Sequence, residues 1–182
     1  MNLSAIKNIN LKLLKSRIIR SLKLEQRVFA EVEADKLALE QAILVVILSS
    51  LAAGIGMIAI VGIISIITTT ILTLIAWVLW IALTYLIATK IIRGLVTKVD
   101  LRQFLRTVGF SSSAGLIRIL GIIPHISAFV FFIASVWMLT AMVLAVKQVF
   151  NYQRLAKAIV VCLAAWLAHI GLIAMALFLF VK

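Results

Sequence analysis

The sequence predicts an all-α integral membrane protein, a polytopic bundle of five transmembrane helices preceded by a basic amphipathic N-terminal helix. Three observations carry this prediction. Residues 42–89 form a run of 48 positions without a charged side chain or histidine, whereas one span needs about 20 apolar residues. Hydrophobic residues make up 65% of the 182 positions, well above a soluble domain. The mean hydropathy is +1.24, and basic residues flank the apolar runs.

The charge of the chain is unevenly distributed. Eighteen Lys and Arg residues stand against six acids, giving a formal net charge of +12. Five of the acids precede the first long apolar run, and after residue 40 the only carboxylate is Asp100. Because the basic residues flank apolar runs, the expected partners are membrane lipids with anionic headgroups, and nucleic acid is not expected. The single cysteine, Cys162, supports neither an internal disulfide nor a cysteine-based metal site.

Residues 1–24 predict a basic amphipathic helix. This segment has no acid and contains six basic residues: Lys7, Lys12, Lys15, Arg17, Arg20 and Lys23. Its apolar residues recur at helical spacing and share one face: Leu11, Leu14, Ile18 and Leu22. Two interpretations are open. The helix lies in the headgroup plane, where Lys7, Lys12, Lys15 and Lys23 contact anionic lipid, or it is solvated and packs on the cytosolic side of its own bundle.

We expect residues 1–40 to form a cytoplasmic N-terminal segment. The first long apolar run begins only at residue 42, so this segment does not resemble a secretory signal. A mitochondrial transit peptide is disfavoured because the segment continues without a processing-like break into residues 29–40, where mixed charge indicates a short helix leading into the membrane.

Four runs read directly as spans: residues 42–60, 70–89, 125–146 and 158–181, with a tight outer turn near residues 62–69. Residues 104–122 are weakly hydrophobic and contain Arg106 and Arg118. Cytoplasmic loops collect Lys and Arg, and a span here places the N-terminus and the basic clusters at 90–106 and 147–157 on one side. The charge pattern therefore predicts five spans, with the N-terminus in the cytoplasm and the C-terminus outside.

The third predicted span has a face of small residues, at Gly109, Ser111–Ser113 and Gly115, which lets neighbouring backbones approach closely. Ala52 and Gly56 form a similar pair on the first span. Two interpretations of Arg118 are open. Its side chain extends toward the outer headgroups, or it faces a polar interior groove or binds a lipid phosphate.

No residue constellation in the sequence predicts catalysis. After residue 40 the predicted spans contain no carboxylate, and the chain has no P-loop, no His/Glu metal motif and no Ser/His/Asp set with an acid on a span. His125 is expected in an outer turn and His169 as a helix-packing residue. We therefore expect a non-enzymatic protein without catalytic, cofactor-binding or metal-binding residues.

Three blocks of the chain resemble a known family. Residues 29–56, FAEVEADKLALEQAILVVILSSLAAGIG, resemble the start of the prokaryotic Yip1-domain family, which enters its first span through a short acidic helix ending in Gln-Ala. Residues 101–124, LRQFLRTVGFSSSAGLIRILGIIP, are similar to the third helix of that family. Residues 136–166, VWMLTAMVLAVKQVFNYQRLAKAIVVCLAAW, are similar to its fourth helix and cytoplasmic turn. The family often has a proline shortly after its Gly-Phe pair, where this chain has residues 111–114, SSSA.

The resemblance implies a Yip1-like five-helix transmembrane domain over residues 41–182, in a prokaryotic plasma membrane. Eukaryotic members associate with Rab GTPases, but no segment here matches a Rab-contacting segment, so that activity is not carried over. Two functions are consistent with the sequence. One is a non-enzymatic scaffold or adaptor that organises lipids or an unidentified membrane or cytoplasmic protein partner, with self-association left open. The alternative is a transporter or channel for a small or lipidic solute, with Arg118 lining the path.

Overall fold

The computed structural model describes residues 10–92 and 99–180, and every regular element in these ranges is helical. The all-α prediction is confirmed for this part of the chain. Four helical segments are long and apolar enough to cross a membrane: Ala38–Val61, Ser65–Ile91, Ser127–Val149 and Leu155–Leu172. The chain is therefore a multi-pass integral membrane protein.

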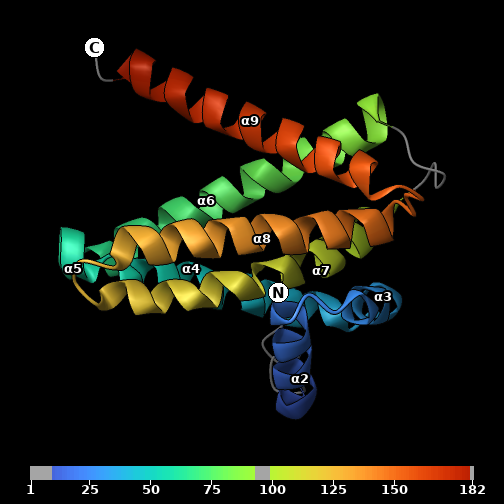
Figure 1. The fold of residues 1–182 in the computed structure, drawn as a ribbon, viewed down its shortest axis with the longest axis horizontal. Coiled ribbons are helices and arrows are strands. Elements are labelled where there is room, and N and C mark those ends of the chain that lie inside the picture. Colours follow the sequence, from blue (N-terminus) through green and yellow to red (C-terminus); the bar gives the residue numbers. More distant parts are fainter. Residues whose placement is uncertain (1–9, 93–98, 181–182) are drawn as a thin grey trace.

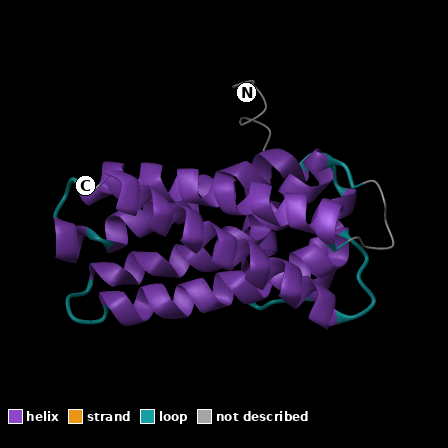
Figure 2. Cartoon of the chain, turned by 90° about the horizontal axis from the view of Figure 1, so that it is seen from above, coloured by secondary structure: helices purple, strands orange, loops and turns teal. Residues whose placement is uncertain are grey.

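The long helices form a bundle whose connections lie at its two ends (Figures 1 and 2). One end carries α5 and the turn before α8, and the other carries α3 and the turn between α8 and α9 (Figure 1). Helix α9 diverges from α8 towards its own C-terminal end (Figure 1). The long elements are α4 (Ala38–Gly56), α6 (Ser65–Leu86), α8 (Ser127–Val149) and α9 (Leu155–Phe180), with α5 (Ile58–Val61) following α4 and the π-helical η1 (Ile87–Ile91) following α6.

The predicted outer turn at residues 62–69 is too long, because helix α6 already begins at Ser65. Gly62 has a positive φ of 87°, and the Ser65 hydroxyl donates to its carbonyl oxygen at 2.7 Å, which closes the turn within three residues. The threonines that follow do not interrupt the helix. The hydroxyl of Thr68 donates to the carbonyl oxygen of Ile64, four residues earlier, and so bonds within the helix.

The segment predicted as a third span consists of α7 (Leu101–Gly109) and the 3₁₀ helix η2 (Phe110–Ile122), which lies against both α4 and α8. Residues 110–115 are all buried. The close approach expected at Gly56 is present, since a Cβ atom there would overlap the carbonyl oxygen of Arg118. A 3₁₀ run of 13 residues is unusually long, because such helices rarely exceed one turn.

Helix α2 (Leu11–Leu22) runs across the direction of the long helices (Figure 1). Asn10 caps it, with its side chain accepting a hydrogen bond from the Leu13 amide at 3.1 Å. Leu24 has a positive φ of 57° and turns the chain into α3 (Gln26–Ala34). Helix α3 buries three apolar side chains completely beneath the bundle end: Val28, Phe29 and Val32.

Candidate functional site

A cavity of about 200 Å³ lies within the bundle and is lined by residues of α4, α6, η2, α8 and α9. Its lining is polar for a site among apolar helices. The hydroxyl groups at its wall belong to Ser49, Ser50, Thr73, Ser112 and Ser135, and its other polar side chains are Trp77, Trp80, Trp166, Arg118 and His169. No carboxylate contributes to the lining. The cavity is therefore rich in hydrogen-bond donors and carries a positive charge.

Arg118 reaches the cavity from η2. Its Nη2 atom donates to the Ser135 hydroxyl oxygen on α8 at 3.2 Å, and its guanidinium carbon lies 5.7 Å from the ring centroid of Phe131. The guanidinium therefore faces α8 and the cavity, as in the interior-groove interpretation of this residue. Within the described residues, no carboxylate forms an ion pair with Arg118.

Three buried polar atoms that belong to cavity-lining residues have no hydrogen-bond partner in the described part of the chain: Arg118 Nε, Trp80 Nε1 and His169 Nδ1. An arginine Nε and an indole nitrogen can only donate. Buried polar groups in folded proteins almost always have partners, and each missing one costs about 1–3 kcal/mol. Water or a bound ligand in the cavity would supply the partners that these three atoms need.

The 3₁₀ geometry of η2 places Ser112 and Arg118 at the same cavity. Side chains three residues apart eclipse each other in a 3₁₀ helix, so Ser112, Gly115 and Arg118 share one face. A Cβ atom at Gly115 would overlap Ser49 Oγ and lie 3.0 Å from Met138 Sδ, and both of these residues line the cavity. In an α-helix the side chains of Ser112 and Arg118 would point roughly 120° apart.

Trp77 orients the Ser112 hydroxyl. The indole Nε1 of Trp77 donates to Ser112 Oγ at 2.8 Å, which leaves the Ser112 hydroxyl hydrogen free to be donated. The Ser135 hydroxyl is engaged differently, since it donates to the Phe131 carbonyl oxygen at 2.7 Å and accepts from Arg118. Three of the four tryptophans of the chain line this cavity: Trp77, Trp80 and Trp166.

A second polar site lies at the opposite, α3-bearing side of the bundle and fixes α2. Arg17 is only 3% exposed and donates three hydrogen bonds of 2.8 Å, to Glu31 Oε1, Asp35 Oδ2 and Gln41 Oε1. Burial alone would raise the pKa of the Glu31 carboxyl, but hydrogen bonds from Arg17 and Arg20 outweigh it and hold that pKa below its ordinary value. The pKa of Asp35 is lowered in the same way, with Arg17 again outweighing burial.

Glu33 connects α3 to the rest of the bundle. Its carboxylate accepts hydrogen bonds from Gln103 on α7 at 2.6 Å and from Gln148 on α8 at 2.8 Å, and its carbonyl oxygen accepts from Arg106. Two further bonds fix the C-terminal end of α2, because the Ser21 hydroxyl donates to the Phe110 carbonyl oxygen and Trp137 Nε1 donates to the Leu22 carbonyl oxygen. The acidic N-terminal residues thus serve to dock α2 and α3.

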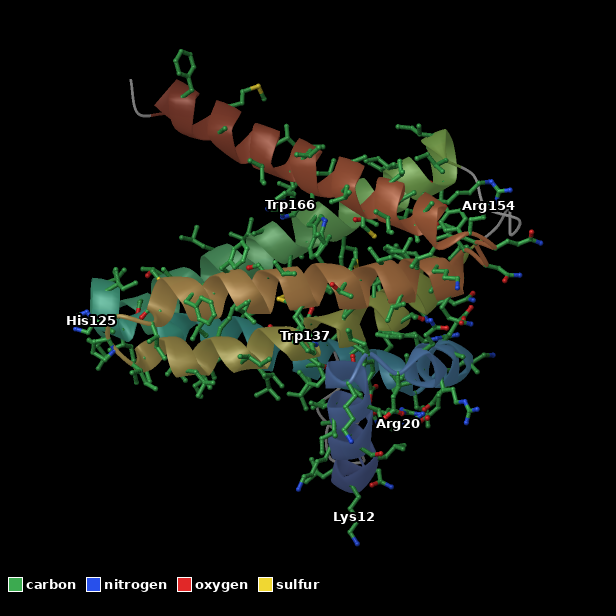
Figure 3. The ribbon with its side chains drawn as sticks, in the orientation of Figure 1. Lys12, Arg20, His125, Trp137, Arg154 and Trp166 are labelled. Atoms are coloured by element: carbon green, nitrogen blue, oxygen red, sulfur yellow. The ribbon has the colours of Figure 1, made fainter. Side chains whose placement is uncertain are left out.

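The predicted headgroup-contacting residues fall in two places. Lys7 lies outside the described residues, whereas Lys12 and Lys15 are exposed on α2 and Lys23 is exposed at the position that caps the C-terminal end of α2. Lys12 and Lys15 border a shallow surface groove with Ser16, Ile19 and Arg20. Figure 3 shows Lys12 at the free tip of α2 and Arg20 nearer the bundle. Arg118 is remote from α2 in the chain and belongs to the cavity instead.

In comparisons with known proteins, no family model, curated protein or solved structure matches the chain. The resemblance to the Yip1-domain family stays a prediction from the sequence. The described residues include no group of three or more His, Cys, Asp or Glu side chains that could hold a metal ion.

Sequence reasoning named Arg118 but missed most of the cavity. The sequence contains a signal for the two cavity serines of α4, because Ser49 and Ser50 are the only polar residues in the predicted span 42–60. No sequence signal marks Trp80 and His169 as cavity residues, since a mid-span aromatic or a lone histidine is usually a packing residue. Arg17 is one of the six basic residues of the first segment, and no pattern in the sequence distinguishes it from those that the structure shows to be exposed.

Proposed function

We propose that this protein is a non-enzymatic integral membrane protein that organises anionic lipids at the membrane face bearing α2. One observation carries the proposal. Helix α2 lies across the long helices (Figure 1) and is held there by the buried Arg17. Lys12 lies at its free tip (Figure 3), and both Lys12 and Lys15 are exposed. In a membrane whose normal follows the long helices, a helix that crosses them runs parallel to the membrane surface, as interfacial helices do.

The composition of the exposed α2 surface supports lipid contact. Ile19 is 41% exposed and Leu11 is 71% exposed, so apolar side chains accompany the lysines on the open part of this helix. A lysine beside an anionic surface contributes about 1 kcal/mol of attraction, and exposed apolar side chains add insertion into the acyl boundary. A scaffold for lipids or for a protein partner would use this face.

The proposed orientation has five spans, with the N-terminus in the cytoplasm and the C-terminus outside. The nine residues of α7 and the 13 of η2 extend about 40 Å at their respective rises, enough to cross a hydrocarbon core of about 30 Å. His125 and Arg154 lie at opposite ends of the bundle (Figure 3). The end with Arg154 carries Lys147 and Lys157 as well, which favours that end as the cytoplasmic one.

The test is lipid enrichment around the full-length protein in polymer discs cut from native membrane. Replacing Lys12, Lys15 and Lys23 together by glutamine should lower the ratio of anionic to zwitterionic lipid retained, measured by mass spectrometry. The matched control replaces Lys147, Arg154 and Lys157 by glutamine and removes the same charge from the end of α8, the turn that follows it and the start of α9. Equal losses in the two variants, or no loss in the first, would contradict a specific role for α2.

A second function, transport of a small or lipidic solute, is favoured by the cavity at Arg118. The test uses liposomes that contain the purified protein. It measures uptake of a small solute into the liposomes, or movement of a lipid between the two leaflets of their bilayer. Solute flux that disappears in the Arg118→Ala variant would support transport, and a protein that produces no flux above empty liposomes would exclude it for that solute.

A further inference from the structure

We propose that the cavity between α4, α6, η2, α8 and α9 is a binding site for a phosphate oxyanion, with Arg118 as its cationic centre. The inference concerns a site inside the bundle, and it does not depend on the role proposed for α2. The arrangement of charge, unpaired donors and space in the cavity carries it.

The first step is charge. Arg118 brings a permanent positive charge into a bundle whose described carboxylates all lie elsewhere: Glu25, Glu31, Glu33, Asp35, Glu40 and Asp100. A guanidinium placed among apolar helices without a counter-charge is energetically unfavourable. Ser135 and the Phe131 ring stabilise it in part, but neither carries a negative charge. A polar space of this size has room for water, but a neutral water molecule does not balance the positive charge of the guanidinium.

The second step is the direction of the hydrogen bonds. Arg118 Nε and Trp80 Nε1 are buried donors without partners in the described residues, and the Ser112 hydroxyl is oriented as a third donor by Trp77. A phosphate group presents several acceptor oxygens and pairs with arginine through charge-assisted hydrogen bonds. Donors that line one cavity without any carboxylate favour an anion over a cation. His169 adds one further nitrogen, which can donate when it carries the proton.

The third step is the shape of the site. The close approach of Gly115 to Ser49 and Met138 brings η2 against α4 and α8 while leaving Ser112 and Arg118 on the cavity side. Trp166 of α9 is 41% exposed and stands at the edge of the site, where α9 diverges from the bundle (Figure 3). The phosphate can therefore belong to a lipid headgroup that enters between helices or to a small soluble anion.

Two measurements on the full-length protein distinguish these sources. Native mass spectrometry of protein released from phosphatidylcholine nanodiscs that contain phosphatidic acid detects a retained phospholipid. Titration with inorganic phosphate in a neutral detergent, followed by tryptophan fluorescence, detects a small anion, since Trp77, Trp80 and Trp166 line the cavity. We expect the wild-type protein to respond in at least one measurement. A retained phosphatidic acid identifies a headgroup, and a fluorescence change with phosphate alone identifies a small anion.

The variants assign the binding to this cavity. Arg118→Gln should weaken it by about tenfold or more, the loss expected for a hydrogen-bonded charge, whereas Arg118→Lys should retain part of it. Trp80→Phe keeps an aromatic ring and removes one donor, so it tests the site even where Arg118→Gln fails to fold. In the titration with inorganic phosphate, the triple glutamine variant of Lys12, Lys15 and Lys23 should respond as wild type, which separates this site from α2. Binding that is absent in wild type, or that is unchanged from wild type in both Arg118→Gln and Trp80→Phe, would overturn the proposal and leave a water-filled cavity.

Discussion

Arg17 Nη2 lies 2.8 Å from Asp35 Oδ2, so a basic residue of α2 is paired with the residue that ends α3. Through Gln41 the same guanidinium also contacts α4, the first long helix of the bundle. One buried arginine thus ties three helices together at the base of α2. The orientation of α2 is therefore fixed by polar contacts as well as by the apolar packing of residues such as Leu14.

Replacing Arg17 by leucine should loosen α2. The loss of a fully buried ion pair costs about 3–5 kcal/mol, and we expect about 2 kcal/mol here because the Glu31 and Asp35 side chains are 34% and 29% exposed. Hydrogen exchange of the α2 amides measures the effect and should become faster in the variant. Lys15→Leu removes the same charge from an exposed position and should leave exchange unchanged. Equal protection of α2 in wild type and Arg17→Leu would rule out this role for Arg17.

Acid should loosen α2 as well. Glu31 and Asp35 have pKa values in the folded protein below their ordinary values of 4.5 and 3.8, so their contribution is complete above those values and is lost as the pH falls through the lowered pKa values. Spin labels on Ser16→Cys and Gln153→Cys, in a Cys162→Ala background, would report the distance between α2 and the turn after α8. The distance distribution should stay narrow down to the ordinary values and broaden below them.

The control for the acid experiment is the double variant Glu31→Gln, Asp35→Asn. It lacks both titrating carboxylates, so its distance distribution should already be broad at neutral pH and change little on acidification. A variant that broadens in acid as wild type does would assign the transition to other groups.

Gly56 should tolerate no larger residue. A Cβ atom there would overlap the Arg118 carbonyl oxygen and lie 3.1 Å from the Phe131 ring, so Gly56→Ala must separate α4 from η2. We expect a loss of about 1–3 kcal/mol, the usual cost of overpacking, seen as a lower unfolding temperature in detergent. Gly171→Ala is the matched control, because no atom lies within 4 Å of a Cβ atom there. Two variants of equal stability would mean that α4 and η2 are free to move apart.

The sequence predicted the elements that depend on hydrophobic length. The four apolar spans were found because a long run without charge has no stable place in water, and their ends differ from the structure by a few residues. The predicted turn at residues 62–69 extends past Ser65, because the sequence alone does not show that threonine hydroxyls such as that of Thr68 bond back within the helix.

The features that depend on tertiary contacts could not be predicted in this way. Arg17 and Lys15 look alike in the sequence, and only the folded positions of Glu31, Asp35 and Gln41 separate the buried residue from the exposed one. The cavity likewise requires five helical segments to meet. The 3₁₀ conformation of η2 has no sequence signature here, yet it decides which residues of that segment lie on the same helix face as Arg118.

The conformation of η2 can be tested by cysteine accessibility. In a Cys162→Ala background, single cysteines at Ser112 and Arg118 should both react with a small water-soluble thiol reagent, because residues six apart in a 3₁₀ helix share the cavity face. Cysteines at Ser113 and Ala114 serve as controls and should stay unreactive, since these two positions do not line the cavity, whereas Ser112 does. An α-helical η2 would instead pair the reactivity of position 112 with that of position 116, one α-turn later. That pattern would separate Arg118 from Ser112 and remove the geometric basis of the phosphate site.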